Sequence, residues 1–301
     1  NGRLQALSIA WDSRPETEGG QRWFHLYPDD TIAPNDSLHW TKPSQNWNFM
    51  CAECHTTDFD KGFNAETLAY NSQWLEHGVG CEGCHGPGEA HISQARSGKF
   101  SANAGLLTQL ARTQAFQFVE GRATAQPVKN TSHKQIEACG RCHSRREVIA
   151  EPYTWGEPLL QTHRPRRLDP PLYFSDGQIR DEVYVYGSFL QSRMYRAGVQ
   201  CADCHEPHSA TLRVEGNALC AQCHRPQVFD TPQHHHHTPG SPGAACVNCH
   251  MPERNYMVVD PRRDHSLRVP RPDLQGEANR PNACGQCHED KTAQWATGQI
   301  D

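Results

Sequence analysis

Hydrophobic and polar positions alternate in one stretch near the start of the chain. In residues 5–11, Leu7, Ile9 and Trp11 occupy every second position, which is the period of a strand with one apolar face. The turn-rich residues 12–20 separate this run from a second extended run at residues 22–27. The pattern therefore predicts a small N-terminal β-hairpin.

Helical spacing of apolar residues occurs in two places. Leucines and alanines in residues 102–112 predict a short helix. In residues 181–197 the apolar positions again recur at helical spacing, and Gly198 is a suitable C-cap. Further upstream, Thr131 or Ser132 is a candidate cap for a turn that places His133 near its start.

The rest of the chain shows no clear period and is rich in Gly and Pro, with 23 and 21 residues respectively. Apolar residues make up only 36% of the 301 residues, which is little material for a core of this size. No apolar run approaches the length of a membrane span. We expect a mostly irregular fold with short α-helices and the small N-terminal hairpin. We also expect a single domain over residues 1–301, because no boundary is convincing.

One motif, Cys-x-x-Cys-His, recurs seven times and uses all 14 cysteines. We number the copies motif 1 (residues 51–55), motif 2 (81–85), motif 3 (139–143), motif 4 (201–205), motif 5 (220–224), motif 6 (246–250) and motif 7 (284–288). This is the attachment signature of c-type haem, in which two thiols form thioethers with the porphyrin and the adjacent imidazole binds the iron. The predicted thioether residues are Cys51, Cys54, Cys81, Cys84, Cys139, Cys142, Cys201, Cys204, Cys220, Cys223, Cys246, Cys249, Cys284 and Cys287. The predicted proximal iron ligands are His55, His85, His143, His205, His224, His250 and His288.

Two other uses of Cys-x-x-Cys pairs have to be weighed, a dithiol redox site and half of a zinc site. Fifteen residues separate Cys204 from Cys220, which suits zinc. However, seven pairs cannot be divided into four-cysteine sites without a remainder. All seven are also followed by His, although only 19 of the 301 residues are His. We therefore predict seven covalently bound haems c, and we expect these apolar plates to form the core that the side chains lack. Without haem we expect no stable fold.

The histidine inventory bears on function, because a haem with two protein ligands is closed and passes electrons, whereas an open one can bind small molecules. Twelve histidines remain after the proximal ones: a tract at residues 234–237 and eight isolated residues. Seven haems need seven second ligands, and this inventory can supply them. From the tract we favour His234 and His237; the isolated candidates are His25, His39, His91, His133, His163, His208, His265 and, least suitably placed, His77.

The formal net charge is −5, and haem propionates would make it more acidic, so nucleic-acid binding is not indicated. Arginines cluster at residues 141–146, 164–167 and 262–263, close to haem motifs or candidate ligands. They could pair with propionates or lie solvated at the surface.

The segments WNFMCAECHTTDFD, GVGCEGCHGPGEAH and GAACVNCHMPERNYMVVDPRRDHS resemble the multihaem cytochrome superfamily of pentahaem nitrite reductase, hydroxylamine oxidoreductase and octahaem proteins. Most closely they resemble the cytochrome part of tetratricopeptide-repeat multihaem proteins. The resemblance implies second-ligand roles for His91, His133, His163, His208, His265 and one tract residue, with His25 and His39 less firmly indicated. Members normally have a further haem motif before this region and helical repeats after it, so we expect a processed or partial chain. No motif here has the Lys that marks the catalytic haem of pentahaem nitrite reductase.

These observations predict an electron-transfer protein with closely spaced, mostly bis-His haems, and a carrier in preference to an enzyme. Its partners would be redox proteins or copies of itself, the latter forming an extracellular conducting filament. The alternative is a reductase of small nitrogen or sulfur species at one five-coordinate haem. Covalent haem attachment occurs outside the bacterial inner membrane, so we expect a periplasmic or extracellular location.

Overall fold

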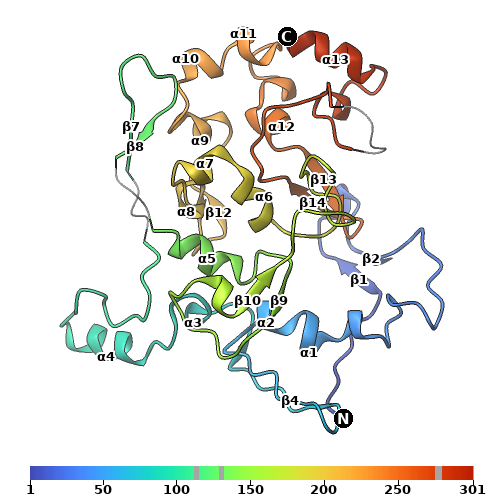
Figure 1. Cartoon of the computed structure of the whole chain (residues 1–301), viewed down its shortest axis with the longest axis vertical. Helices are drawn as coiled ribbons and strands as arrows, with labels where there is room; N and C mark the ends of the chain where they lie inside the picture. Colours follow the sequence, from blue (N-terminus) through green and yellow to red (C-terminus); the bar gives the residue numbers. More distant parts are fainter. Residues whose placement is uncertain (112–114, 129–131, 275–279, 301) are drawn as a thin grey trace. The chain divides into compact units, whose positions relative to one another are not determined.

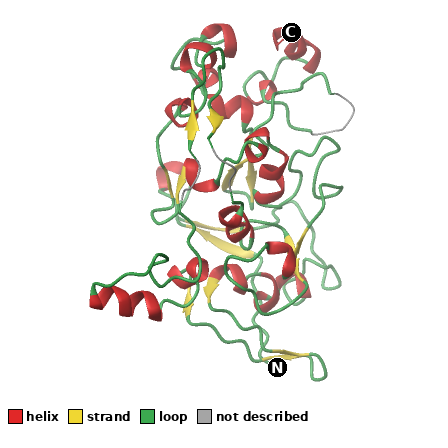
Figure 2. Ribbon diagram, turned by 60° about the vertical axis from the view of Figure 1, so that its left-hand side comes forward, coloured by secondary structure: helices red, strands yellow, loops and turns green. Residues whose placement is uncertain are grey.

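The computed structural model describes residues 1–111, 115–128, 132–274 and 280–300. Loops predominate, and the helices and strands are short (Figure 2). The chain divides into two compact units, one of residues 1–109 with 255–261 and the other of residues 110–254 with 262–301. Compactness alone does not show that either unit folds independently, so the expected single domain stays a prediction.

The N-terminal hairpin is confirmed. Strand β1 (Ile9–Asp12) pairs antiparallel with β2 (Arg22–His25), with Trp11 opposite Trp23 and Ile9 opposite His25. The first strand is shorter than the expected run over residues 5–11, because Gln5 instead forms an isolated bridge with Asn46.

Short elements make up the rest of the first unit. They are η1 (Glu16–Glu18), η2 (Pro43–Gln45), α1 (Trp47–Met50), α2 (Ala52–His55), β3 (Thr56–Thr57), β4 (Phe63–Asn64), β5 (Ala69–Tyr70), β6 (Glu76–His77), α3 (Cys81–His85) and α4 (Glu89–Ser97). Strand β3 pairs with β6, and β4 pairs with β5. The first of these ladders links motif 1 to motif 2, because the N–H of Gly80 also donates to the hydroxyl of Thr57 at 2.7 Å.

The prediction of a helix at residues 102–112 is wrong for residues 102–111. Residue 112 lies outside the described residues. Residues 102–111 form turns and loop. Ala104 and Gly105 adopt the left-handed conformation, with φ of 52° and 75°, which ends a right-handed helix. The side-chain amide of Asn103 also donates to the carbonyl of Leu106 at 2.8 Å, a local bond that competes with helix formation.

The second unit contains most of the haem motifs. Its elements, together with the β13–β14 hairpin at its border, are β7 (Phe116–Gln117), β8 (Gln126–Pro127), α5 (Lys134–Gly140), β9 (Arg146–Val148), η3 (Leu159–Gln161), β10 (His163–Pro165), α6 (Tyr186–Gln191), α7 (Arg193–Arg196), α8 (Cys201–Cys204), β11 (His205–Glu206), β12 (Thr211–Leu212), α9 (Asn217–Ala221), α10 (Pro226–Phe229), α11 (Pro232–His235), η4 (Pro242–Ala244), α12 (Cys246–His250), β13 (Glu253–Tyr256), β14 (Asp260–Arg263), η5 (Cys284–Gln286) and α13 (Ala293–Ile300) (Figure 1). The strands form separate two-stranded sheets, including β10 with β9 and β13 with β14.

One helix was expected over residues 181–197, but the structure has two, α6 and α7. The first of them starts later than expected. Tyr184 has a left-handed φ of 60°, so no helix forms before Tyr186. Ser192 is extended, and its hydroxyl accepts a bond from the N–H of Tyr195 at 2.9 Å, so it acts as the N-cap of a new helix. The predicted end is confirmed, because Gly198 has a φ of 84° and donates its N–H to the carbonyl of Tyr195.

The position of His133 at the start of α5 is confirmed, but the N-cap is His133 itself and not Ser132. The hydroxyl of Ser132 accepts a bond from the N–H of Lys134 at 3.3 Å. Thr131, the other candidate cap, lies outside the described residues.

The apolar core built by side chains is small. In the second unit its centre is Ile136, Leu159 and Tyr186, which join α5, η3 and α6. A larger number of big apolar side chains is exposed, among them Trp23 at 67% and Leu75 at 64%. No helix within the described ranges is both long and apolar enough to cross a bilayer.

Candidate haem-binding sites

Each haem motif is wound into a single helical turn. In motifs 1, 3, 5 and 7 the N–H of the His donates to the carbonyl of the first Cys, at 2.8 to 3.1 Å, and in motif 4 the N–H of His205 donates to the carbonyl of Cys201 in the same way. Motifs 2 and 6 coincide with the helices α3 and α12. Positions i, i+3 and i+4 share one face of a helix. The turn therefore presents both thiols and the imidazole on the same side, as attachment to one porphyrin requires.

Cysteines from different motifs contact one another in the second unit. Cys139 of motif 3 is hydrogen-bonded to Cys201 of motif 4, and this bond, together with burial, raises the pKa of the Cys139 thiol. Cys220 of motif 5 is likewise hydrogen-bonded to Cys246 of motif 6, which raises the pKa of Cys246. Porphyrins attached through these sulfurs would have adjacent edges.

Electrostatic interactions connect the remaining neighbours in this series. The hydrogen bond to Cys246 lowers the pKa of Cys220 in motif 5, and the nearby thiol of Cys204 in motif 4 opposes this shift. Burial raises the pKa of Cys249 in motif 6, and the nearby thiols of Cys284 and Cys287 in motif 7 raise it further. Motifs 3 to 7 thus follow one another in space in the order of the sequence.

Two buried glutamines hold motif 4 against α5. The amide oxygen of Gln135 accepts a bond from the N–H of Ala202 at 2.8 Å, and its nitrogen donates to the carbonyl of Leu110 at 2.7 Å. Gln200 donates to the carbonyl of Ser132 at 2.7 Å. These bonds, between residues up to 68 positions apart, bring Cys139 and Cys201 together.

Replacing Gln135 with Leu leaves the N–H of Ala202 and the carbonyl of Leu110 without partners inside the protein. We expect Gln135→Leu to lower the free energy of unfolding by about 1–3 kcal/mol. Chemical denaturation of the haem-loaded protein, followed by haem absorbance, measures this. The control is Gln109→Leu, because Gln109 is exposed and its side-chain amide donates to the carbonyl of Ala102 at 3.0 Å. Equal stability of the two variants contradicts the role given to Gln135.

Three motif histidines face a second histidine at the same spacing. The ring centres are 6.2 Å apart for His205 and His265, with 24° between the ring planes. They are 6.0 Å apart for His234 and His250, at 14°. A metal bonded to two imidazole nitrogens at about 2 Å each separates the ring centres by roughly 6 Å.

The third pair is His237 and His288, with ring centres 5.9 Å apart and 33° between the planes. The tract thus supplies two of the three partners, one to motif 6 and one to motif 7. Each of the three pairs would be able to hold one haem iron between its two imidazoles.

Hydrogen bonds at Nδ1 orient these imidazoles. His265 donates from Nδ1 to the carbonyl of Arg263, and His250 donates to the carbonyl of Arg268, both at 2.9 Å. His237 donates in the same way to the carbonyl of His235. Such bonds leave Nε2 for a metal and are the usual support of a metal-bound imidazole.

The protonation state also suits iron, which binds neutral imidazole. Burial lowers the pKa of His205, and that of His265 is lowered by burial and by the charge of His205. The pKa values of His224 and His143 are also lowered, mainly by burial and then by the charges of neighbouring histidines. The residues present therefore fit covalently held haem.

The other predicted second ligands of the first unit are His25, His39 and His91. Their Nδ1 atoms are hydrogen-bonded to Tyr27, Thr41 and Ala104, at 2.9, 2.9 and 2.7 Å respectively. His25 lies on β2 and His91 on α4. These residues stay predicted ligands.

In the second unit the other predicted second ligands are His133, His163 and His208. His133 packs on the ring of Tyr195, with centres 4.7 Å apart. His163 is fully buried on β10, and its Nδ1 is 2.8 Å from the hydroxyl of Thr162. His208 is exposed and donates to the carboxylate of Glu206 at 3.1 Å. They too stay predicted ligands.

The arginine clusters make ion pairs within the protein. Arg164 and Arg166 both pair with Glu147, and Arg262 pairs with Glu182 at 2.8 Å. Pairing with propionates stays a prediction.

Two families of known proteins match parts of the chain. The family described as the doubled CXXCH motif matches residues 194–229, which include motifs 4 and 5. The family described as cytochrome c554 and c-prime matches residues 28–86, which include motifs 1 and 2. The chain is a multihaem c-type cytochrome. Both matches support covalent binding of c-type haem at these motifs.

The fold of this multihaem cytochrome is similar to that of the outer cell wall cytochrome OcwA. The TM-score is 0.61 at 18% identity, and the match covers 99% of this chain and 68% of the other. An undecahaem cytochrome from the S-layer of Carboxydothermus ferrireducens matches with a TM-score of 0.43 at 19% identity, over 98% of this chain and 50% of the other.

Among curated proteins, the dissimilatory sulfite reductase MccA of Wolinella succinogenes is 23% identical to this cytochrome over 67% of the chain. The match covers 27% of that protein, so the cytochrome spans about a quarter of the relative's length.

Proposed function

We propose that this cytochrome carries seven haems c and passes electrons along them. The contacts of cysteines between motifs, Cys139 with Cys201 and Cys220 with Cys246, carry the proposal. Electron tunnelling requires short distances between porphyrin edges, and these sulfurs bring the edges together. Bound haem supplies a reversible one-electron iron couple; the chain spaces, orients and insulates it.

The paired imidazoles support a bis-His assignment for three of the haems. We number the haems as their motifs. His265 is then the second ligand of haem 4, His234 that of haem 6 and His237 that of haem 7. The remaining haems would draw theirs from the six other predicted residues, namely His25, His39, His91, His133, His163 and His208.

The haems would also form the core of the fold. Large apolar side chains are exposed throughout the chain, and a porphyrin is an apolar plate able to cover them. The small cluster around Ile136 then serves to position motifs 3 and 4.

The count and the ligation are testable together. An intact mass with seven haem adducts, and a ferric electron paramagnetic resonance spectrum dominated by low-spin signals, are the expected results. Fewer adducts would contradict the count, and a large high-spin fraction would contradict closed haems.

A substitution tests the ligand pairs individually. We expect His265→Ala to convert one low-spin haem of the seven to high spin, because the iron of haem 4 loses its second imidazole. Magnetic resonance and redox titration of the purified holoprotein measure this. His236→Ala is the control, since it removes an imidazole from the tract that contains two proposed ligands without removing a proposed ligand. An unchanged spectrum in His265→Ala removes the assignment.

Location and partners follow from the attachment chemistry. We propose export to the periplasm or the cell exterior, with redox proteins or further copies of the chain as partners. Electron microscopy of purified material distinguishes the two: ordered fibres indicate a filament, and uniform single particles indicate a carrier. Membership of the nitrite reductase, hydroxylamine oxidoreductase and octahaem superfamily belongs to the same proposal, as does the resemblance to the cytochrome part of tetratricopeptide-repeat multihaem cytochromes.

A second candidate function is reduction of a small sulfur or nitrogen species at one open haem. The similarity to dissimilatory sulfite reductase MccA favours it. Turnover of sulfite or nitrite with a reduced dye as electron donor, accompanied by a high-spin signal that either anion perturbs, would establish this function in place of simple transfer.

A further inference from the structure

One short loop, residues 263–268, contacts imidazoles that are assigned to two different haems. At its start the carbonyl of Arg263 accepts a bond from Nδ1 of His265, the proposed second ligand of haem 4. At its end the carbonyl of Arg268 accepts a bond from Nδ1 of His250, the proximal ligand of haem 6. Any movement of this loop would therefore act on both haems.

The residue next to His265 anchors the first half of the loop. Asp264 is buried, and its carboxylate accepts bonds from the N–H of Ser266 at 2.8 Å and of Ile179 at 3.2 Å. Its own N–H donates to the carbonyl of Pro252 at 3.0 Å. The loop is thus tied to a segment that lies 85 residues earlier in the sequence.

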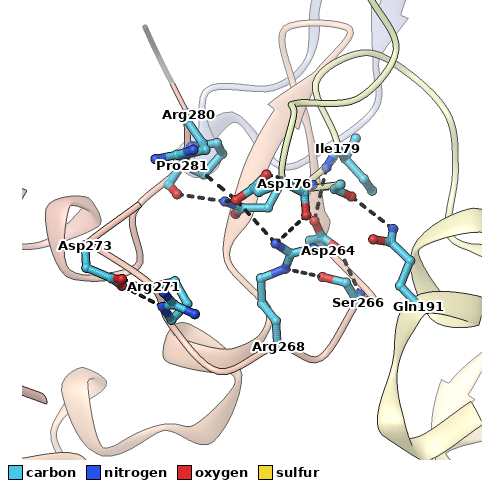
Figure 3. A network of polar contacts seen from close by, with 12 residues as sticks. Asp176, Ile179, Gln191, Asp264, Ser266, Arg268, Arg271, Asp273, Arg280 and Pro281 are labelled. Atoms are coloured by element: carbon cyan, nitrogen blue, oxygen red, sulfur yellow. Dashed lines mark hydrogen bonds and ion pairs between the residues drawn. The ribbon is translucent and has the colours of Figure 1, made fainter. Parts of the chain in front are cut away.

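The side chain of Arg268 anchors the second half (Figure 3). Its Nε donates to the hydroxyl of Ser266 at 2.9 Å, and Nη1 donates to the backbone carbonyl of Asp176 at 3.1 Å. Nη1 also lies 3.3 Å from the carboxylate of Asp176, whose side chain is only 10% exposed. A fork of this kind fixes the direction of a guanidinium group, which a single contact does not.

Asp176 is itself held in place from other directions. Its carboxylate accepts a bond from the amide of Gln178 at 2.8 Å, and Gln178 also donates to the carbonyl of Pro281 at 3.1 Å. Arg280 lies 3.9 Å from the same carboxylate. The anchor of Arg268 is therefore held by several contacts and largely buried.

We propose that Arg268, held by Asp176, is a positioning residue that sets the ligand geometry of two haems together, haem 4 through His265 and haem 6 through His250. The proposal rests on the proposed ligation of these haems. A strong bond from Nδ1 to a carbonyl makes the imidazole a better donor to iron and favours the ferric state. Loosening the loop weakens both bonds, so both haem potentials rise.

The test is Arg268→Gln in the haem-loaded protein, with a spectroscopic redox titration and a ferric magnetic resonance spectrum. We expect two of the seven haems to shift to higher potential and to change their low-spin signals. Asp176→Asn removes the charge but retains the carbonyl acceptor, so it should shift the same two haems by a smaller amount. If Arg268→Gln does not assemble, the Asp176→Asn result decides.

The chain offers a matched control three residues further on. Arg271 pairs with Asp273 at 2.5 Å, but the two side chains are 54% and 38% exposed. Arg271→Gln removes the same charge from the same segment, and all seven haems should retain their potentials.

Two results overturn the proposal. In one, Arg268→Gln and Asp176→Asn leave every potential unchanged; in the other, they shift all haems alike. Either result leaves the proposed function standing, provided that His265→Ala still converts one haem to high spin. If His265→Ala has no such effect, the ligand assignment itself fails.

Discussion

Electron flow along the cytochrome is expected to fall by orders of magnitude when haem 5 is removed by Cys220→Ser with Cys223→Ser. Motif 5 connects motif 4, through the interaction of Cys204 with Cys220, to motif 6, through the bond of Cys220 to Cys246. Without the porphyrin held there, an electron has to cross the space that it occupied, and tunnelling rates fall exponentially with distance. Fast spectroscopy after partial photoreduction measures how quickly electrons redistribute among the remaining haems.

A second double variant controls for the mere loss of one haem. Cys51→Ser with Cys54→Ser removes haem 1, which belongs to the other compact unit. It should leave redistribution among haems 3 to 7 at its original rate. Equal slowing in the two variants, with six haems retained in each, would contradict the order of the series.

The second large effect is expected from the chain made without haem. Ordering the chain costs about 1.5 kcal/mol per residue in conformational entropy. The apolar side chains that become buried are few. We expect no cooperative unfolding transition and a collapsed or disordered ensemble.

Expression without the haem-attachment machinery provides this material, and calorimetry with one-dimensional proton NMR examines it. The haem-loaded protein, prepared in parallel, is the reference. A dispersed spectrum with a cooperative transition in the haem-free chain would show that side chains alone stabilise the fold.

Some elements of the chain follow their local sequence pattern and others do not. The N-terminal hairpin was predicted correctly, because Leu7, Ile9 and Trp11 occupy every second position before a turn-rich stretch, and this signal is local. The helix over residues 102–112 was not, because its leucines have helical spacing but Ala104 and Gly105 adopt left-handed conformations. Ser192 divided another predicted helix for a similar reason, since its hydroxyl caps the helix that follows it.

The candidate site shows the same division. Tract residues His234 and His237 were selected from the sequence as ligands, but only the folded chain shows His234 opposite His250 and His237 opposite His288. Gln135 carries no sequence signal, because its partners Ala202 and Leu110 are 67 and 25 residues away.

The sequence by itself determined the chemistry: seven Cys-x-x-Cys-His motifs, a surplus of histidines and too few apolar residues for an ordinary core. These properties are local or compositional, so each can be identified from neighbouring residues alone. The tertiary structure decided which motifs are neighbours, which imidazoles face each other, and that Arg268 and Asp176 support the loop between two of them. Such contacts join residues far apart in the chain, and they depend on the path of loops that no periodic pattern describes.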